Sequence, residues 1–381
     1  MRILYLADDY PNSKVHHNLA QSLSEYSKDN EVFVFSSLRK SFSIEDSKKK
    51  YGDYSYTYIC KDVDINHLSY KFNFWEKRNS KLRGLLNSID IENIDFIIAS
   101  TLFSNGVVAL ELNKRYNIPF IVSTRGTDTN LYIKRLFHLW YIGKQIVDNT
   151  NNIIFISESV KRNFLNSLFV KLTVSDIKDK CVVIPNGIDN YFLANQYPKK
   201  DIIKAKNFLY IGDFSSNKNI IFIIKAFENL QLFYPDINLN LVGGGGRIEG
   251  NQEKDIIEYV NNNTSINYLG KIFDRRQLSS VMRENDVFIM VSHGETFGLV
   301  YIEALSQGLP IIYTKGQGVD GFFDDMNVGE KADSKSIDSI YNAMKKMIED
   351  YPSYENIGDK INQFTWENNS KMIMNCINNL I

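Results

Sequence analysis

The sequence is poor in cysteine and has no excess of charge of either sign. Its 381 residues include only three cysteines, which lie far apart along the chain. This pattern fits buried thiols in a reducing cytosol and argues against a disulfide scaffold or a zinc ribbon. Lysine and arginine number 44 against 45 aspartate and glutamate, for a formal net charge of −1. A net-basic nucleic-acid-binding protein is therefore not expected, although local basic patches are compatible with this balance.

Long hydrophobic runs are also absent. No stretch approaches the roughly 18 consecutive apolar residues that a membrane-spanning helix requires. The first apolar run, residues 2–7, is followed at once by Asp8 and Asp9. It is too short for a signal peptide and has the length of a buried strand. We therefore expect a soluble protein of the cytoplasm.

Short apolar segments alternate with longer amphipathic ones along the chain. Segments that read as strands are residues 2–7, 31–36, 54–60, 95–100, 119–124, 152–157, 207–212, 238–242, 266–269, 286–292 and 309–314. Between them lie segments with helical spacing, such as 105–116, 131–147 and 219–233. Strands that alternate with helices predict parallel sheets. The predicted fold class is α/β, with two Rossmann-like doubly wound domains.

The pattern restarts after residue 205, which sets the predicted domain boundaries. We expect a first domain at residues 1–195 and a second at 206–365, joined by a polar stretch with Pro198 and several lysines. Residues 366–381 read as one amphipathic helix, which we expect to pack back on the first domain.

Glycine is missing where a dinucleotide-binding enzyme needs it. Residues 8–14, after the first strand, contain none, which disfavours a hydride-transferring dehydrogenase. The run Gly243–Gly246 follows a later strand, but no Gly-Lys-Ser/Thr closes it, so a phosphate loop of the ATPase type is also disfavoured. A nucleotide-sugar transferase and a two-lobed ligand-binding protein remain.

The most informative segment, residues 292–304, leads from an apolar strand into a helix. Open α/β sheets bind ligands at such loops, and the backbone N–H groups around Phe297–Leu299 can point at an anion. Glu303, inside the helix, can meet a neutral hydroxyl, and Glu295 precedes the helix. The pattern predicts a diphosphate flanked by two hydroxyl-bearing rings. Alternatively, Glu303 is a solvated helix residue and Glu295 only stabilises the helix N-terminus.

With these motifs the sequence resembles the retaining family 4 glycosyltransferases of the GT-B fold. The family's two glutamates, separated by seven residues, are matched by Glu295 and Glu303, with Phe297-Gly298 between them. Further matches are Ile156–Ser159, Ile184–Asp189 with Phe192, Ile211–Lys218 and Val242–Gly245. The resemblance implies that the second domain binds a nucleotide-sugar donor and the first an acceptor, with the chemistry in the cleft.

The resemblance also implies residue roles. Glu303 is expected to hold the donor ribose and Glu295 the transferred sugar. Further donor-binding residues are expected to be Phe297, Gly298, Leu299, Gly212, Gly243, Arg247, Lys271 and Ile272. Short loops near Gly243–Arg247 and Gly270–Ile272 are expected to select the base of the donor. The donor nucleotide is expected to be UDP rather than GDP.

One position departs from the family pattern. The family usually carries an arginine two residues after Ile211 and a lysine five residues later, both on the diphosphate; here these are Asp213 and Lys218. Lys218 keeps a point charge for the leaving diphosphate, but the fork-shaped donor is lost. Arg247, Lys271 and Arg275 are the candidates for replacement charge, and their spacing does not distinguish them.

In the first domain, the run from Arg125 to Asp128 follows an apolar segment. Many family members have a histidine where Arg125 stands. Arginine stays protonated and cannot act as a general base, so Arg125 is expected to hold phosphate or the acceptor, with Asp128 as its catalytic neighbour. The alternative is a salt bridge between the two that shapes the loop. His16 and His17 either border the ligand or are merely solvated.

Two other patterns concern metals and membranes. Asp62-Val63-Asp64 resembles the metal-binding pair of another glycosyltransferase fold, but we regard it as a chance match, and neither a metal nor a cofactor is expected. Residues 131–141 mix apolar, aromatic and basic side chains. A packed helix with a basic outer stripe is the favoured interpretation. The alternative is a helix on an anionic membrane, where lipid-linked acceptors are found.

The resemblance thus implies a retaining, metal-independent hexosyltransferase that uses a nucleoside-diphosphate sugar and a hydroxyl acceptor. The expected acceptor is a lipid-linked glycan in bacterial surface polysaccharide synthesis, such as O-antigen or capsule, which places the enzyme in the cytoplasm or on the inner face of the cell membrane. Two alternatives remain: a nucleotide-sugar epimerase of the same two-domain layout, and a non-catalytic sugar-nucleotide binding module, to which Asp213 points.

Overall fold

The computed structural model describes residues 1–8, 10, 14–38, 48, 52–62, 73–175, 177–246 and 250–380. The chain divides into two compact units. The first comprises Met1–Ile156, Val160–Gly187 and Trp366–Ile381, and the second comprises Ser157–Ser159 and Ile188–Thr365. The division after Gly187 comes earlier than the predicted linker, and residues 188–195 belong to the second unit. The C-terminal residues from Trp366 belong to the first.

The first unit is built on a parallel sheet with the strand order β3-β2-β1-β4-β5-β6-β7. Its strands are β1 (Arg2–Leu6), β2 (Glu31–Leu38), β3 (Thr57–Asp62), β4 (Phe96–Ala99), β5 (Phe120–Thr124), β6 (Ile153–Phe155) and β7 (Cys181–Val183). Its helices are α1 (Lys14–Glu25), α3 (Phe74–Leu86), η1 (Ile91–Asn93), α4 (Gly106–Tyr116), η2 (Asp128–Ile133), η3 (Phe137–Leu139), α5 (Trp140–Asn149), α6 (Glu158–Leu165), α7 (Leu168–Thr173), η4 (Lys178–Lys180) and α14 (Trp366–Asn378).

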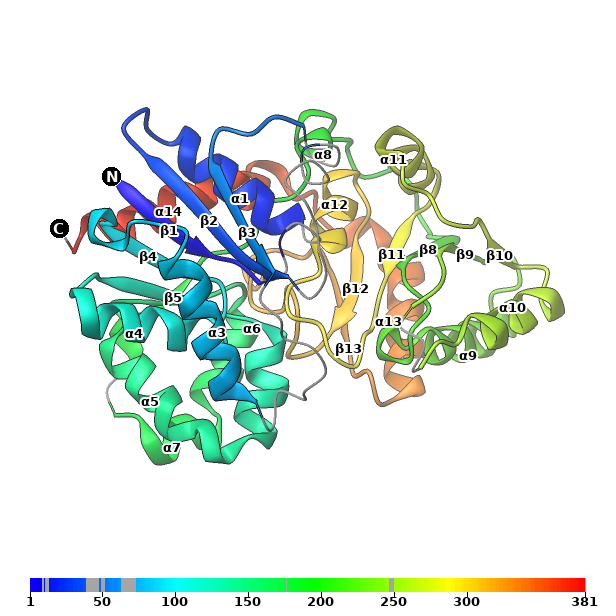
Figure 1. Ribbon diagram of the computed structural model, residues 1–381. Coiled ribbons are helices and arrows are strands. Elements are labelled where there is room, and N and C mark those ends of the chain that lie inside the picture. The colour runs from blue at the N-terminus through cyan, green and yellow to red at the C-terminus, as the bar shows by residue number, and fades with distance from the viewer. Residues whose placement is uncertain are drawn as a thin grey trace. The chain divides into compact units, whose positions relative to one another are not determined.

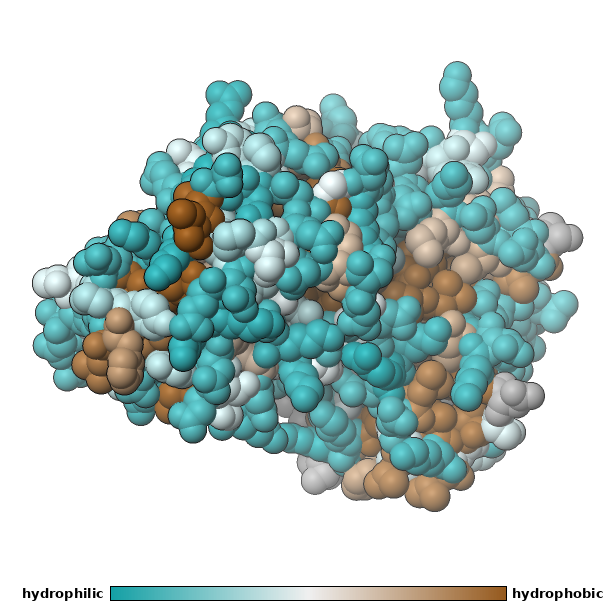
Figure 2. Space-filling model, turned by 180° about the vertical axis from the view of Figure 1, so that it is seen from behind, coloured by the Kyte–Doolittle hydropathy of each residue, from teal (hydrophilic) through white to brown (hydrophobic). Residues whose placement is uncertain are grey.

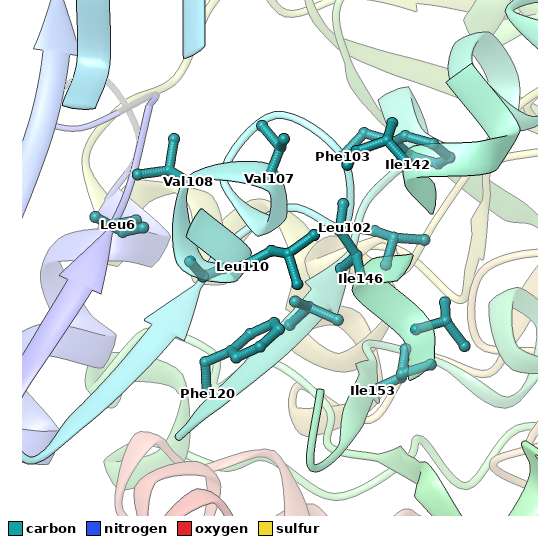
Figure 3. Packing of buried hydrophobic residues seen from close by; sticks show 14 of the residues in the cluster. Leu6, Leu102, Phe103, Val107, Val108, Leu110, Phe120, Ile142, Ile146 and Ile153 are labelled. Atoms are coloured by element: carbon teal, nitrogen blue, oxygen red, sulfur yellow. The ribbon is translucent and has the colours of Figure 1, made fainter. Parts of the chain in front are cut away.

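Helices cover both faces of this sheet (Figure 1). Because side chains alternate along a strand, Leu4 and Leu6 of β1 enter one apolar cluster while Ile3 and Tyr5 enter the other. In the first cluster, side chains of α4, α5, β5 and β6 point toward one another (Figure 3). In the second, α1 and α14 pack together on the opposite face. Burial on both faces explains why these strands read as continuous apolar runs.

The single helix expected at residues 131–147 is broken in the structure. The segment forms the π-helical η2, the short η3 and then α5. Leu136 lies between them with φ −111° and ψ 58°, outside the helical region. Its side chain is buried in the first apolar cluster, so the break in the helix coincides with a residue anchored in the core.

The second unit is a parallel sheet with the strand order β10-β9-β8-β11-β12-β13. Its strands are β8 (Asn207–Gly212), β9 (Asn238–Gly243), β10 (Ile266–Tyr268), β11 (Val287–Ile289), β12 (Ile311–Thr314) and β13 (Gly329–Ala332). Its helices are α8 (Asn190–Ala194), η5 (Ser216–Lys218), α9 (Ile220–Gln231), α10 (Glu253–Asn262), α11 (Arg275–Glu284), α12 (Leu299–Ser306), α13 (Ile337–Glu349), η6 (Tyr351–Ser353) and η7 (Gly358–Phe364). The two parallel α/β units agree with the predicted fold class.

The strand orders fix where ligands are expected. In each sheet the order reverses beside the first strand of the unit: between β1 and β4 in the first, and between β8 and β11 in the second. Ligands of open α/β sheets bind outside the carboxyl ends of the strands at such a reversal. Ligands are therefore expected at the loops that follow β8 and β11, and at those that follow β1 and β4. No helix in the described parts of the chain is long and apolar enough to cross a membrane.

Candidate functional site

An ion pair joins the loops that follow β8 and β11 in the second unit. The Nζ atom of Lys218, at the end of η5, lies 2.9 Å from Oε2 of Glu295, and the two side chains are only 20% and 13% exposed. The structure thus brings together two residues that are far apart in sequence and that the sequence assigned to one site. Water screens this pair less than it screens a surface salt bridge.

Two asparagines fix Lys218 from both sides. Asn219 is buried in the left-handed conformation with φ 59°, and its amide donates to the carbonyls of Val291 (3.1 Å) and Ser334 (2.8 Å). Asn217 donates to the carbonyl of Gly294 at 3.0 Å. Asparagine tolerates the left-handed region better than other non-glycine residues. These bonds tie η5 to the loop that carries Glu295.

Gln317, which sequence reasoning missed, holds the backbone of the glutamate loop. Its Oε1 accepts from the N–H of Glu295 at 2.8 Å, and its Nε2 donates to the carbonyl of His293 at 3.1 Å. The N–H of Gly318 donates to the carbonyl of Glu295 at 3.1 Å. Both backbone groups of Glu295 are therefore bonded, so its position is set by the turn after β12. The only sequence signal for this turn is the Gly-Gln-Gly at 316–318.

Gly298 allows α12 to begin directly after the glutamate loop. It is left-handed, with φ 79°, and a Cβ atom there would come within 2.5 Å of the Tyr301 ring. The N–H groups of Leu299 and Val300 lie in the first turn of α12, where helix geometry provides no partner within the helix. Phe297 is buried against Phe322 and Phe364, so only its backbone can meet a ligand. Glu303 lies further along α12 and is half-buried.

The glycines at the ends of β8 and β9 lie against each other. Gly243 has φ 137°, and a Cβ atom there would come within 1.7 Å of the carbonyl oxygen of Gly212. The N–H of Gly243 donates to the carbonyl of Gly270 at 2.9 Å. The loop that contains the exposed Lys271 and the half-buried Ile272 therefore begins beside the glycine run. The predicted donor-binding residue Arg247 lies outside the described residues.

The carboxylate of Asp213 is hydrogen-bonded within its own loop. Its Oδ1 accepts from the N–H of Ser215 at 3.0 Å, as in an Asx turn. The buried Tyr210 donates its hydroxyl to the carbonyl of Asp213 at 2.8 Å. Burial, with the negative charges of Asp213 and Glu295 as further causes, holds the pKa of Tyr210 well above its usual value. Tyr210 is therefore a neutral donor that supports the turn.

In the first unit, Asp128 organises two loops instead of facing a substrate. Its fully buried carboxylate accepts from the backbone N–H groups of Leu102 (3.2 Å), Phe103 (3.0 Å) and Arg125 (2.9 Å). Burial raises the pKa of Asp128 to about 6, although these three donors act in the opposite direction. From this position Asp128 cannot contact a substrate, so the geometry opposes the predicted catalytic role. The predicted alternative, a side-chain salt bridge with Arg125, is replaced by the backbone contact.

Arg125 itself lies at the carboxyl edge of the sheet. Its guanidinium is only partly buried and donates through Nε to the carbonyl of Ser100 at 3.3 Å. His16 is nearby: burial, followed by the charge of Arg125, lowers the pKa of His16 to about 3. His17 is half-buried, and burial, followed by the charge of Lys14, lowers its pKa to about 4. Both histidines are therefore neutral at neutral pH, and His16 is not solvated as the alternative interpretation had it.

Lys81 is a second residue that the sequence did not reveal. Its ammonium is almost fully buried and lies 2.6 Å from Oδ2 of Asp8, 2.9 Å from Oγ of Ser104 and 2.9 Å from Oδ1 of Asn105. Burial alone would raise the pKa of Asp8, but the charges of Lys81 and Lys77 outweigh it and lower that pKa. This network braces the ends of β1 and β4. No signal in the sequence pairs Lys81 with Asp8.

The described residues contain no group of three or more histidine, cysteine, aspartate or glutamate side chains that could hold a metal ion. Of the Asp62-Val63-Asp64 pattern, Val63 and Asp64 lie outside the described residues.

Two family models match consecutive parts of the chain. The model described as glycosyltransferase family 4 matches residues 13–190, and the model described as glycosyl transferases group 1 matches residues 195–364. The chain belongs to glycosyltransferase family 4. Its two parallel α/β units are those of the GT-B fold.

Curated relatives and a solved structure agree with this assignment. An uncharacterized glycosyltransferase of Methanocaldococcus jannaschii is 27% identical over 289 residues, which is 74% of each chain. Alpha-monoglucosyldiacylglycerol synthase of Streptococcus pneumoniae is 24% identical over 69% of this chain and 64% of its own length. The structure of Anabaena HepE in complex with UDP and glucose has a TM-score of 0.69 and 15% identity over 99% of both chains. This glycosyltransferase therefore shares its fold with a protein whose structure contains UDP and glucose.

Proposed function

We propose that this glycosyltransferase moves a hexosyl group, with retention of configuration, from a uridine-diphosphate sugar to a hydroxyl group of an acceptor. The ion pair between Lys218 and Glu295, placed beside the first turn of α12, is the observation that carries the proposal. Lys218 provides a cation for a diphosphate, and the first turn of α12 provides backbone N–H groups. The carboxylate of Glu295 lies beside them and can bind hydroxyl groups.

The proposed reaction follows the front-face route implied by the resemblance. The bond between the anomeric carbon and the diphosphate oxygen breaks, and the acceptor oxygen bonds to the same face of that carbon. The acceptor's proton passes to the leaving phosphate oxygen, so no side chain has to act as a base. Lys218 and the N–H groups of Leu299 and Val300 stabilise the negative charge that develops on the diphosphate. Glu295 orients the transferred sugar, and Glu303 holds the ribose.

We further propose that the reaction needs no metal ion. Lys218 and the helix terminus would supply the electrostatic stabilisation that a divalent cation gives elsewhere. Turnover should therefore be unchanged by EDTA and by added Mg²⁺ or Mn²⁺. Loss of turnover in EDTA that is restored by one of these ions would reject metal independence.

The donor base is proposed to be uracil, which is supported by the UDP in the HepE structure. A thermal-shift screen against UDP-, GDP- and ADP-sugars tests this, because a bound ligand raises stability with the logarithm of its concentration over its dissociation constant. UDP compounds should raise the melting temperature most. For the donor that binds, NMR of the transfer product reports the anomeric configuration, and an inverted product would reject the proposed route.

The acceptor is proposed to be a lipid-linked glycan of bacterial surface polysaccharide synthesis. The name of the Streptococcus pneumoniae relative, a monoglucosyldiacylglycerol synthase, supports a lipid acceptor. A surface of the first unit, the apolar–basic patch, supports a place on the membrane. Its apolar members are exposed by 57% to 75% and are Phe137, Tyr141, Leu168 and Leu172. Its basic members are exposed and are Lys134, Arg135 and Lys171.

The elements that carry the apolar–basic patch pack against each other. Lys134 and Arg135 precede η3, Phe137 lies in η3, Tyr141 lies in α5, and the other members lie in α7. The helix α5 packs against both η3 and α7. Trp140 bridges them, with ring centroids 5.0 Å from Phe137 and 5.8 Å from Phe169 of α7. Figure 2 views the protein from behind, so the lower left of Figure 1, where α5 and α7 lie, is at its lower right. Apolar residues gather there on the surface. Apolar side chains flanked by cations suit a bilayer surface that carries anionic lipids.

Flotation with liposomes tests the membrane partner. The protein should float with vesicles of phosphatidylglycerol but not with vesicles of phosphatidylcholine alone. Both Lys134→Glu/Arg135→Glu and Leu168→Gln/Leu172→Gln should abolish flotation. The charge-matched control Lys254→Glu/Lys335→Glu changes exposed lysines of the second unit and should float normally. Flotation that survives both patch variants would reject this surface as the membrane contact.

A non-catalytic sugar-nucleotide binding module is the second candidate, because Asp213 stands where the family usually has an arginine. Membership of a glycosyltransferase family favours the enzyme over the epimerase alternative. Release of UDP from a UDP-sugar that the protein binds, with or without acceptor, separates the enzyme from the binding module. Binding without release or transfer would establish the module.

A further inference from the structure

Among the described residues that were assigned to the diphosphate, Lys218 is the only cation, whereas a diphosphate carries more than one negative charge. Each phosphate of a nucleoside-diphosphate sugar carries a negative charge, and Lys218 is already paired with Glu295. Position 213 adds a negative charge where the family pattern has a positive one. A second cation near the ends of β8 and β9 would restore the balance.

Of the two described candidates for that cation, Arg275 is committed elsewhere. Its Nε lies 3.1 Å from Oδ2 of Asp189, and its Nη1 donates to the carbonyl of Phe273 at 2.8 Å. These bonds tie the start of α11 to Asp189, which directly precedes α8. A phosphate would therefore have to compete with Asp189 for the charge of Arg275.

Lys271, in contrast, is exposed, and its ammonium lies over the glycine run. A Cβ atom built on Gly245 would come within 3.1 Å of its Nζ, and one built on Gly244 within 3.3 Å of its Cε. Within the described residues, no carboxylate lies within ion-pair distance of Lys271. The Glu253 carboxylate lies over the same glycine run but forms no ion pair with Lys271, so the ammonium can bind a ligand.

The glycine run under this ammonium is bonded to the loop that contains Asp213. The carbonyl of Gly245 accepts from the N–H of Phe214 at 3.0 Å, and Phe214 directly follows Asp213. The residues Gly243–Gly246 all have positive φ values between 73° and 137°, a conformation that glycine adopts without strain. Beside Lys271, Oε1 of Glu253 and the hydroxyl of Tyr268 also lie over this run, within 2.6 and 2.8 Å of a Cβ atom built on Gly244. A phosphate beside Gly212 and Gly243 would meet Nζ of Lys271 from the side where the missing arginine would stand.

On the basis of the proposed function, we propose that Lys271 is the second diphosphate-binding cation of this glycosyltransferase and replaces the arginine that Asp213 displaces. The two lysines then bind the diphosphate from different loops: Lys218 from the loop after β8, and Lys271 from the loop after β10. Because a lysine is a point charge on a flexible stem, this arrangement needs no fork geometry at position 213.

Calorimetric titration with UDP and with uridine tests the assignment. Lys271→Met should weaken UDP binding about tenfold, the effect of losing one charge-assisted hydrogen bond, and should leave uridine binding unchanged. Lys254→Met, which removes an exposed lysine of α10, is the matched control and should bind UDP as the wild type does. The double variant Lys271→Met/Asp213→Arg should recover UDP affinity, because the arginine restores the positive charge at the other side of the glycine run.

The outcomes separate this assignment from the proposed function. If the wild type binds neither UDP nor GDP or ADP, the proposed function fails. If the wild type binds one of these nucleotides and Lys271→Met binds it equally well, the role of Lys271 is overturned while the proposed function stands. Equal losses of UDP and uridine affinity would also overturn it, because they would place Lys271 on the nucleoside. Failure of Asp213→Arg to rescue would reject the claim that Lys271 replaces the arginine.

Discussion

Nζ of Lys218 lies 2.9 Å from Oε2 of Glu295, so that the two side chains form an ion pair. The cation proposed for the diphosphate is thus neutralised by the carboxylate proposed for the sugar. A donor must compete with Glu295 for Lys218 before it is fully bound. Removal of the carboxylate should therefore affect binding and turnover in opposite ways.

The first prediction concerns Glu295→Gln. UDP should bind at least as tightly as in the wild type, because Lys218 is released, while kcat should fall about 100-fold through the lost sugar contact. Calorimetry and steady-state kinetics measure the two effects. Lys218→Met is the comparison and should lose both UDP affinity and turnover. If Glu295→Gln weakened UDP binding as much as Lys218→Met, competition within the pair would be ruled out.

The second prediction concerns Glu303→Ala. UDP binding should weaken by about 1.5–3 kcal/mol, the range for hydrogen bonds to a charged group. The wild type and the variant should bind 2′,3′-dideoxy-UDP equally, since that ligand has no ribose hydroxyl for the carboxylate. Glu258→Ala, an exposed residue of α10, serves as control. A deficit that persists with the dideoxy ligand would exclude the ribose contact.

The third prediction compares two left-handed glycines, Gly298 and Gly316, with φ values of 79° and 75°. An added Cβ atom meets the Tyr301 ring at the first, but nothing within 4 Å at the second. Gly316→Ala should cost about 1 kcal/mol of unfolding free energy from backbone strain alone. Gly298→Ala should cost at least about twice as much. Urea denaturation measures both, and equal losses would show that the ring moves aside freely.

The fourth prediction concerns the pH dependence of Asp128. Burial raises its pKa in the folded state to about 6 from the ordinary aspartate value of 3.8, so the folded protein binds this proton more tightly than the unfolded chain. The resulting stability is full below about pH 4 and is lost as the pH rises through about 6, by on the order of 3 kcal/mol. The wild type should therefore exceed Asp128→Asn in unfolding free energy most at low pH. A gap that stays constant between pH 4 and pH 7 would show an unshifted pKa.

The sequence predicted most strands because buried parallel strands are continuous apolar runs. It missed β7, which has three residues, and β13, whose Gly-Glu-Lys-Ala is polar. The strand β13 forms by pairing with β12 at the sheet edge, and this pairing cannot be predicted from the residues of β13 alone. The linker was placed late for a related reason: Tyr191 and Asp189 are fixed to the second unit by contacts with Ser279 and Arg275, far along the chain.

In the candidate site, too, residues that lie in one sequence segment could be predicted, whereas contacts between distant parts of the chain could not. Glu295, Gly298 and Glu303 lie in one segment whose order predicts a helix start, so they could be recognised from the sequence. Lys81 could not, because its partner Asp8 lies 73 residues away. The burial of Asp128 was also missed, since an aspartate after a strand looks the same whether it faces solvent or three backbone N–H groups.

The membership of α14 in the first unit has a consequence for synthesis of the protein. Ser22 of α1 donates to the carbonyl of Trp366, and Asn369 donates to the carbonyl of Pro185. Ile377 is fully buried in the cluster that α1 and α14 share. The rest of the first unit therefore leaves the ribosome before α14, and until α14 has been synthesised one face of its sheet is covered only in part, by α1. Expression of the second half alone should yield a more self-sufficient fragment than expression of the first half without α14.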